Sequence, residues 1–456
     1  MRHSASRRAF LQRASALSLA AGAAPWALTL ASIGEAAAQT ATDYKALVCV
    51  FLYGGNDHAN TLPPFDAANH ARYAALRGSI ALARDTLAAT ALQPAVPLAD
   101  GRQYALHPSL APLLPIFVAG EMAPLLNIGT LVQPTTKAEY ATRAVPLPPK
   151  LFSHNDQQSF WQSASPEGAR SGWGGRIGDR IVDGNGNATF TCVSVAGNAV
   201  YLTGESAVQY QVGAAGSVAV RGLESPLFGS AACSQALYRQ LTAPRNHLLE
   251  AAYAGITRRA LDAHAQLSAA LDGIETQTVF PESSLGGQLK MVARMIAARD
   301  ALGARRQVFF VSLGGFDTHS NLTATHPGLL AEVADALAAF HAEMRLAGDG
   351  DAVTAFTASD FGRTLVANND GSDHGWGSMQ FVLGGAVNGG RYFGTPPAMA
   401  SDGPDDVGQG RLLPTLAVDQ LAATLALWFG VPASDLPDVV PNIGHFDTAD
   451  IGLMRA

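Results

Sequence analysis

Continuous runs of apolar residues mark the predicted strands of this chain. Strands of a parallel sheet are buried on both faces, so they read as unbroken apolar segments, whereas half-exposed strands alternate. Such runs, bounded by glycine or polar turn residues, cover residues 46–53, 122–128, 307–313, 352–356 and 379–383. The pattern therefore predicts an α/β fold with a mostly parallel sheet.

Segments with apolar residues at helical spacing lie between these runs. Residues 327–346 predict an amphipathic helix, whose apolar stripe holds Leu330, Val333, Leu337, Phe340 and Met344. Ala-rich helical patterns also cover residues 65–93, 234–271 and 415–429. Helices that alternate with buried strands are typical of α/β proteins.

Two further regions complete the predicted organisation. Residues 189–195 alternate like a strand, and residues 198–202 are expected to pair with them. Residues 203–285 carry no recognisable chemistry, so we expect an insertion or cap over the sheet. The prediction for residues 39–456 is a single domain of this architecture.

Composition narrows the class of protein. The chain has 456 residues, of which 48% are hydrophobic and 15% charged, so it can bury a large core. Its formal net charge is −7, and no basic block follows the extreme N-terminus, which argues against nucleic acid as a partner. Three cysteines, Cys49, Cys192 and Cys233, are too few for a disulfide framework, although one bridge between Cys192 and Cys233 stays open.

The N-terminus reads as an export signal. Ser6-Arg7-Arg8-Ala9-Phe10-Leu11-Gln12 matches the twin-arginine pattern, an apolar Ala-rich segment follows, and Ala36–Ala38 fits a cleavage site. We predict a twin-arginine signal peptide over residues 1–38, the twin-arginine export machinery as a partner, and a periplasmic or secreted protein. An uncleaved anchor and a chance amphipathic helix are the alternatives. No later run reaches the roughly 18 apolar residues of a membrane span, so none is expected in the mature chain.

Aspartates follow three of the predicted strands. Asp57 comes after Gly54 and Gly55, Asp317 after Gly314 and Gly315, and Asp360 directly after a buried run. Because the carboxyl ends of parallel strands meet at one edge of a sheet, we expect these side chains to gather there. A plain turn is the alternative at each position, since Asp, Gly and Asn are ordinary loop residues.

Histidines near these aspartates complete a candidate metal site. His319 lies two residues after Asp317, and Asp373 and His374 precede the run at 379–383. Carboxylate oxygens and imidazole nitrogens bind Zn²⁺, Mn²⁺ and similar ions. Crowded carboxylates resist ionising together unless cations lie between them. The predicted ligands of two divalent ions are Asp57, Asp317, His319, Asp360, Asp373 and His374.

Ser153 begins a predicted helix, and two functions are open to it. Polar residues 153–158 precede Phe160 and Trp161, which predicts a helix start with Ser153 or Asn155 near the N-cap. A serine at this position is commonly a cap. It can also be a nucleophile, because the free amides and dipole of the helix N-terminus favour an alkoxide and a bound phosphate.

Several short motifs together resemble a known family. They are Arg7-Arg8, Gly54-Gly55-Asn56-Asp57 with Asn60-Thr61, Ser153-His154, Gly314-Gly315-Phe316-Asp317-Thr318-His319, Ser359-Asp360-Phe361-Gly362-Arg363-Thr364 and Asp373-His374-Gly375. In this order they resemble the bacterial domain-of-unknown-function family DUF1501, which is itself similar to the alkaline phosphatase and sulfatase superfamily. The resemblance implies a parallel sheet sandwiched between helices, a two-metal site, and Ser153 as the nucleophile.

The sequence departs from the superfamily pattern at defined positions. Phe361 follows Asp360 where the superfamily usually has histidine, and Thr61 is a rival nucleophile. None of the cysteines has the Cys-x-Pro-x-Arg setting of a formylglycine sulfatase.

Two functions follow from this pattern. The first is an exported hydrolase of phosphate or sulfate esters on a small molecule or polysaccharide, with Ser153 attacking and Arg363 binding the anion. Its two divalent ions would be Zn²⁺, Mn²⁺, Mg²⁺ or Ca²⁺. The alternative is a non-catalytic periplasmic or cell-surface protein that retains the fold and a structural metal.

Overall fold

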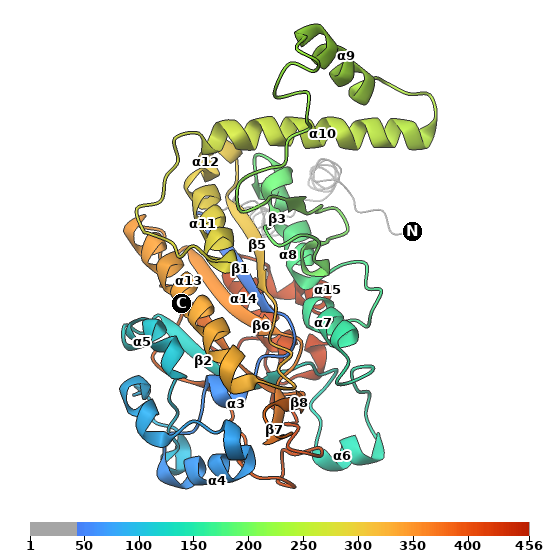
Figure 1. The fold of residues 1–456 in the computed structure, drawn as a ribbon. Coiled ribbons are helices and arrows are strands. Elements are labelled where there is room, and N and C mark those ends of the chain that lie inside the picture. The colour runs from blue at the N-terminus through green and yellow to red at the C-terminus, as the bar shows by residue number, and fades with distance from the viewer. Residues whose placement is uncertain (1–42, 456) are drawn as a thin grey trace, which may run out of the picture. The chain divides into compact units, whose positions relative to one another are not determined.

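The predicted apolar runs form the centre of one sheet. In the computed structural model, which describes residues 43–455, its strands are β1 (Lys45–Leu52), β2 (Met122–Gly129), β3 (Cys192–Ser194), β4 (Tyr210–Gln211), β5 (Arg306–Leu313), β6 (Val353–Ser359), β9 (Ser378–Leu383), β10 (Phe393–Gly394) and β11 (Leu416–Ala417). Their order is β10-β2-β9-β6-β1-β5-β3-β4, and β11 pairs with β2 (Figure 1). All five apolar runs are strands of this sheet, as predicted. The predicted signal peptide lies outside the described residues.

All described strands of this sheet except β9 run in the same direction. β1 pairs in parallel with β5 on one side and β6 on the other, so that Val48 lies opposite Phe309 and Ala355. β9 is antiparallel to both of its neighbours, β2 and β6. The predicted mostly parallel α/β sheet is therefore confirmed.

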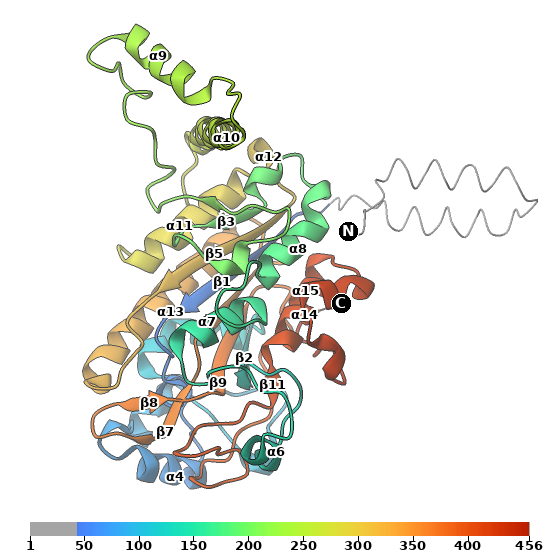
Figure 2. The ribbon, with the colours of Figure 1, turned by 90° about the vertical axis from the view of Figure 1, so that its right-hand side faces the viewer.

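Helices cover both faces of this sheet. The helices are α3 (His58–Thr61), α4 (Ala67–Arg77), α5 (Leu114–Val118), α6 (Lys137–Thr142), α7 (His154–Ser163), α8 (Trp173–Ile181), α9 (Ala231–Thr242), α10 (Leu248–Leu271), α11 (Ser284–Ala297), α12 (Arg299–Leu302), α13 (Leu322–Leu346), α14 (Val418–Phe429) and α15 (Leu436–Val439). α11 and α13 lie on one face, and α7, α8, α14 and α15 on the other (Figures 1 and 2).

The central strand shows why both layers are needed. Along β1, Ala46, Val48 and Val50 pack into the core beneath α11 and α13. Leu47, Cys49 and Phe51 pack into the core beneath α8 and α14. Successive side chains of a strand point to opposite faces, so an unbroken apolar run needs an apolar layer on each side.

The structure corrects or refines three of the predictions. Residues 198–202 do not extend the sheet, because Val200–Leu202 form a 3₁₀ turn (η7) whose Tyr201 ring packs on Trp173 of α8 at 4.7 Å. The helical pattern at 234–271 is divided into α9 and α10 by a break that contains Pro244. All three cysteines are free, so Cys192 and Cys233 form no bridge here.

The predicted insertion at 203–285 includes α9 and α10. Both helices lie at the end of the sheet opposite to a small hairpin formed by β7 (Arg363–Ala367) and β8 (Ser372–His374) (Figures 1 and 2). None of the helices within residues 43–455 is long and apolar enough to cross a membrane.

Asp419 in the first turn of α14 allows a test of the buried core by pH. Burial raises the pKa of this carboxyl to about 6. Its folded pKa thus lies above the unfolded value, so its contribution favours folding at low pH and is lost as the pH rises through 6. We expect Asp419→Asn to raise the free energy of unfolding at pH 8 by about 1–3 kcal/mol and to have less effect at pH 4.

Urea unfolding at both pH values measures this difference. Asp335→Asn, an exposed site on α13, is the matched control and should change stability little at either pH. A loss of stability in Asp419→Asn at pH 8 would contradict the expected cost of the buried charge.

Candidate functional site

The loops after β1 and β5 meet closely at the carboxyl edge of the sheet. Gly54, directly beyond β1, has φ +116°, and a Cβ atom there would lie 2.4 Å from the backbone nitrogen of Asp317. Glycine is therefore required for this approach. The Gly54 amide also donates to Oδ1 of Asp360 at 3.1 Å. One tight turn thus brings the loops after β1, β5 and β6 together.

The antiparallel direction of β9 brings His374 to the same edge. After β6 the chain forms β7 and β8, and it then returns into the sheet as β9. Because β9 runs opposite to β6, the residues before β9 lie beside those that follow β6. Asp373 and His374, which end β8, therefore reach the site from the segment that leads into β9. The aspartates after β1, β5 and β6 instead follow the ends of their strands.

Helix α7 supplies a histidine that the sequence did not single out as a ligand. Nδ1 of His154, the first residue of α7, lies 2.6 Å from Oδ2 of Asp360. One turn later, the amide of Gln158 donates to the same oxygen at 2.8 Å. The sequence feature that could have indicated this ligand is the pair Ser153-His154 at the start of a predicted helix, where only the serine was a candidate.

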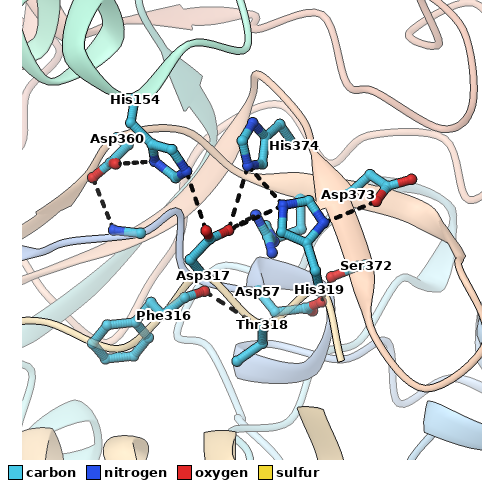
Figure 3. Close-up of polar contacts among 12 residues, drawn as sticks. Asp57, His154, Phe316, Asp317, Thr318, His319, Asp360, Ser372, Asp373 and His374 are labelled. Atoms are coloured by element: carbon cyan, nitrogen blue, oxygen red, sulfur yellow. Dashed lines mark hydrogen bonds and ion pairs between the residues drawn. The ribbon is translucent and has the colours of Figure 1, made fainter. Parts of the chain in front are cut away.

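Three imidazoles converge on the carboxylate of Asp317 (Figure 3). Nε2 of His319 and Nε2 of His374 lie 3.2 and 3.3 Å from Oδ1 of Asp317. Nε2 of His154 lies 3.4 Å from Oδ2. Ligand atoms of His154, Asp317 and His374 all lie within 4.8 Å of one another. We call His154, Asp317, His319 and His374 the histidine cluster.

The outer nitrogen of each imidazole is held by an oxygen. Nδ1 of His154 contacts Asp360, Nδ1 of His319 lies 3.0 Å from Oδ1 of Asp373, and Nδ1 of His374 lies 2.7 Å from the carbonyl oxygen of Phe152. Ionised carboxylates and carbonyls only accept hydrogen bonds, so Nδ1 carries the proton in each neutral ring and Nε2 keeps its lone pair. The three inward-facing nitrogens are therefore poised as ligands.

This arrangement fits a metal ion. Nε2 of His319 and Nε2 of His374 are only 2.9 Å apart, and two lone pairs at that distance repel unless a cation or a proton lies between them. The side chains of Asp317 and His319 are 47% and 44% exposed, so the cluster is open to solvent. Imidazole nitrogens with a carboxylate oxygen are a common ligand set of transition metals.

Neighbouring charges shift the pKa values within the cluster. The hydrogen bond to Asp360 raises the pKa of His154, whereas burial lowers that of His374. Burial alone would raise the pKa of Asp317, but the guanidinium of Arg363 holds it below its usual value. Asp317 is accordingly an ionised carboxylate beside histidines of unequal basicity.

Arg363 of β7 is a buried cation with unused donors. Its side chain is fully buried, and its Nη1 donates to Oδ1 of Asp317 at 3.0 Å. Its Nε and Nη2 have no hydrogen-bond partner among the described residues. These two buried nitrogens carry three N–H groups, so the guanidinium keeps unsatisfied donors next to Asp317 that suit an anion.

Two of the predicted metal ligands act from outside the cluster. Asp360 is buried and accepts from Gly54, His154 and Gln158, so both of its oxygens are occupied. Oδ1 of Asp373 contacts His319 and also accepts from Asn368 at 2.6 Å. Both carboxylates orient histidines, which is the usual function of an outer layer around a metal site.

Asp57 lies apart from the histidine cluster. Its Oδ2 contacts Nη2 of Arg77 and accepts from Ser372 at 2.6 Å, and its Oδ1 accepts from the Asn60 amide as the N-cap of α3. Asp57 and Arg77 are both fully buried. Arg77 satisfies this carboxylate in place of a metal ion, so we leave Asp57 out of the ligand set.

Neither candidate nucleophile forms a side-chain hydrogen bond with the cluster among the described residues. The hydroxyl of Ser153, at the N-cap of α7, donates to Oδ2 of Asp156 at 2.9 Å. Thr61 is buried, and its hydroxyl donates to the carbonyl of Asp57. Ser153 adjoins His154 in the chain, whereas Thr61 belongs to the buried layer around Asp57.

Phe361 packs against the cluster. Its buried ring lies 5.0 Å from the ring of His154 and 4.6 Å from that of His374, centroid to centroid. The phenylalanine that stands where a histidine was expected thus supports two histidines from other segments.

The sequence matches the model of one known protein family. Residues 44–436 match the family described as "Protein of unknown function (DUF1501)". The chain belongs to the DUF1501 family. The matched segment of this DUF1501 protein includes the whole sheet and every residue of the histidine cluster. Curated protein sequences contain no match to it.

Solved structures similar to this DUF1501 protein include a protein in complex with k-i-k-neocarrahexaose, a sulfatase and a synthase. They are Ps i-CgsB in complex with k-i-k-neocarrahexaose (10% identity, 88% of this chain, 77% of that chain, TM-score 0.37), the PsFucS1 sulfatase from Pseudoalteromonas sp. (10%, 94%, 76%, 0.37) and the lipoteichoic acid synthase LtaP from Listeria monocytogenes (10%, 89%, 79%, 0.30). At these TM-scores the similarities carry no argument about activity, and the function proposed below rests on the residues of this chain.

The buried pair of Arg77 and Asp57 generates a stability prediction. Removing one partner of a buried ion pair leaves the other charge uncompensated, so we expect Arg77→Met to lower the free energy of unfolding by about 3–5 kcal/mol. Arg180→Met is the matched control, because Arg180 and Asp438 form an exposed pair at 2.6 Å. That change should cost about 0–1 kcal/mol. Urea unfolding at neutral pH compares the two, and equal losses would refute the structural role of the buried pair.

Proposed function

We propose that this DUF1501 protein is an exported, metal-dependent hydrolase of phosphate or sulfate esters. The observation that carries the proposal is the convergence of three imidazole Nε2 atoms on the carboxylate of Asp317, with each Nδ1 held by an oxygen. A set of lone pairs aimed at one point is a cation site, and it lies where ligands bind in open α/β sheets. The twin-arginine pattern at Arg7 and Arg8 supports export.

The proposed ligands are Asp317, His154, His319 and His374. A metal ion held there would polarise the oxygens of a bound ester. The nitrogen-rich set favours Zn²⁺ or another transition metal over Mg²⁺ or Ca²⁺, which prefer oxygen ligands. The carboxylate of Asp57 is paired with Arg77 and is not free to bind a second ion. We therefore propose one ion at this cluster, whereas the sequence suggested two.

Arg363 would bind the anionic group of the ester. Its unused donors lie on a guanidinium already fixed by Asp317, so little side-chain freedom is lost when an anion binds. A nonbridging oxygen of the ester's phosphate or sulfate group, bound beside Asp317, would accept hydrogen bonds from Nε and Nη2 of Arg363. Phosphate and sulfate esters both have such oxygens, so the experiment has to compare both classes.

Ser153 remains the proposed nucleophile. It stands at the N-terminus of α7, whose free amides favour a developing negative charge, and its hydroxyl already donates to Asp156. Ser153 Oγ would lose its proton and bond to the phosphorus or sulfur, while the bond to the alcohol oxygen breaks and that oxygen takes up a proton. Water would then hydrolyse the serine ester, release phosphate or sulfate, and restore the Ser153 hydroxyl. One observation favours the alternative, a non-catalytic metal-binding protein: the Ser153 hydroxyl contacts Asp156 and not the cluster.

Metal binding is the first test. Mature protein supplied with metals should hold one tightly bound ion per chain by elemental analysis, and His319→Ala or His374→Ala should lose it. Asp373→Asn should weaken affinity about 10–100-fold, because it replaces the charged carboxylate that orients His319 with a neutral amide. His445→Ala, whose Nδ1 bonds to the Val132 carbonyl away from the cluster, is the control. Folded parent protein without bound metal would end the proposal of a metal enzyme.

Hydrolysis is the second test. Metal-reconstituted protein should be screened against phosphate monoesters, phosphate diesters and sulfate esters, with Asp360→Asn as an inactive reference. We expect Ser153→Ala to lower kcat on the preferred ester at least about 10³-fold while keeping the metal. Thr61→Val tests the rival hydroxyl and should retain turnover. If Ser153→Ala hydrolyses the ester as fast as the parent, Ser153 is not the nucleophile.

A further inference from the structure

A hollow of about 600 Å³ adjoins the histidine cluster. It is lined by nine residues of one segment, Tyr140, Ala141, Arg143, Val145, Leu147, Pro148, Lys150, Leu151 and Phe152. We call it the 140–152 hollow. Ligand sites of proteins typically have volumes of about 300–1,000 Å³ and combine apolar walls with few polar groups.

Phe152 joins this hollow to the metal cluster. Phe152 lines the hollow, and its carbonyl oxygen accepts from Nδ1 of His374 at 2.7 Å. The guanidinium of Arg411 lies 4.7 Å above the Phe152 ring, and its Nε donates to the carbonyl oxygen of His374 at 2.9 Å. A ligand that spans the cluster and the hollow would therefore pass one continuous wall.

The backbone of the segment is held in an unfavourable conformation. Arg143, Lys150 and Phe152 have φ values of +52°, +43° and +74°, although none is glycine. Such conformations cost energy and persist where surrounding structure enforces them, often at ligand-binding segments. Arg143 is the left-handed C-cap of α6, and its amide bonds to the carbonyl oxygens of Glu139 and Tyr140. The rest of the segment is held by apolar packing, because Leu147, Leu151 and Phe152 lie against the core cluster that contains Trp376.

The positive charge of the residues that line the hollow favours an anionic ligand. Its lining includes two cations and no carboxylate, although the whole chain carries a net charge of −7. Arg143 and Lys150 are exposed, and no described residue pairs with Arg143. Lys150 lies 3.6 Å from Asp156, but its side chain is 70% exposed, so this pair is weak and the ammonium stays available.

We propose that the 140–152 hollow binds the alcohol part of the ester substrate, and that this part has a flat apolar body and a second anionic group. The proposal rests on the proposed function, since the first anionic group would lie at the cluster and Arg363. Tyr140, Leu147 and Phe152 supply apolar surface for the body, and Arg143 and Lys150 supply cations for the second charge. The substrate class is thus a polyanionic ester and not a simple monoanionic one.

Two non-hydrolysable probes test the hollow separately from catalysis. Phenylphosphonate presents only the first anionic group, and 4-carboxyphenylphosphonate adds a second. Calorimetry on the metal-reconstituted mature protein should show about fivefold or greater preference for the carboxylated probe, as expected from one or two exposed ion pairs. The variant Arg143→Gln/Lys150→Gln should lose this preference while binding phenylphosphonate as the parent does.

The control and the outcomes separate the two proposals. Arg72→Gln/Lys290→Gln removes the same charge from exposed residues that do not line the hollow, and it should keep the preference. A parent without preference, or a hollow variant that retains it, overturns the inference while leaving ester hydrolysis intact. Failure of the parent to bind either phosphonate overturns the proposed anion site at the cluster and the hollow's role together.

Discussion

The carboxylate of Asp317 is the interaction on which the site depends. It contacts side chains from the start of α7, its own loop, β7 and β8, segments that lie far apart in the chain. It can reach them only because Gly54 lets the loops after β1 and β5 approach within backbone contact. A side chain at position 54 would push the loop that carries Asp317 and His319 away from the loop after β1. The close turn is thus a condition for the chemistry as well as for the fold.

A buried polar layer supports this carboxylate from behind. Asp57 binds Arg77 and Ser372, and Arg77 also donates to the Thr364 carbonyl at 2.9 Å. These bonds tie the loop after β1 and helix α4 to both strands of the β7–β8 hairpin. Arg363 of β7 directly precedes Thr364, and His374 of β8 follows Ser372 by two residues. The buried ion pair of Arg77 and Asp57 therefore fixes the position of the β7–β8 hairpin, because a buried charge is stable only with its partner in place.

The sequence predicted the frame of the site better than its ligands. Unbroken apolar runs required strands buried on both faces. Of the three aspartates that follow such runs, Asp317 and Asp360 share the contact with His154, whereas Asp57 pairs with Arg77. The sequence does not reveal the partner of Asp57, because Arg77 belongs to an Ala-rich helical pattern in which nothing marks it as buried. It does not reveal the position of His154 either, because a polar residue at a helix start is commonly explained by capping. The position of His374 depends on the antiparallel direction of β9, which a short apolar run does not reveal.

Charge balance connects the cluster to its surroundings. With neutral histidines, the carboxylates of Asp317, Asp360 and Asp373 exceed the guanidinium of Arg363 by two negative charges, and a divalent cation would offset this excess. In the proposed function, a bound ester would add negative charge beyond this balance, within a chain that is itself acidic. Arg143 and Lys150, which line the 140–152 hollow, would compensate for part of it. Metal and substrate recognition would then be parts of one electrostatic arrangement, in which each added charge requires a counter-charge close by.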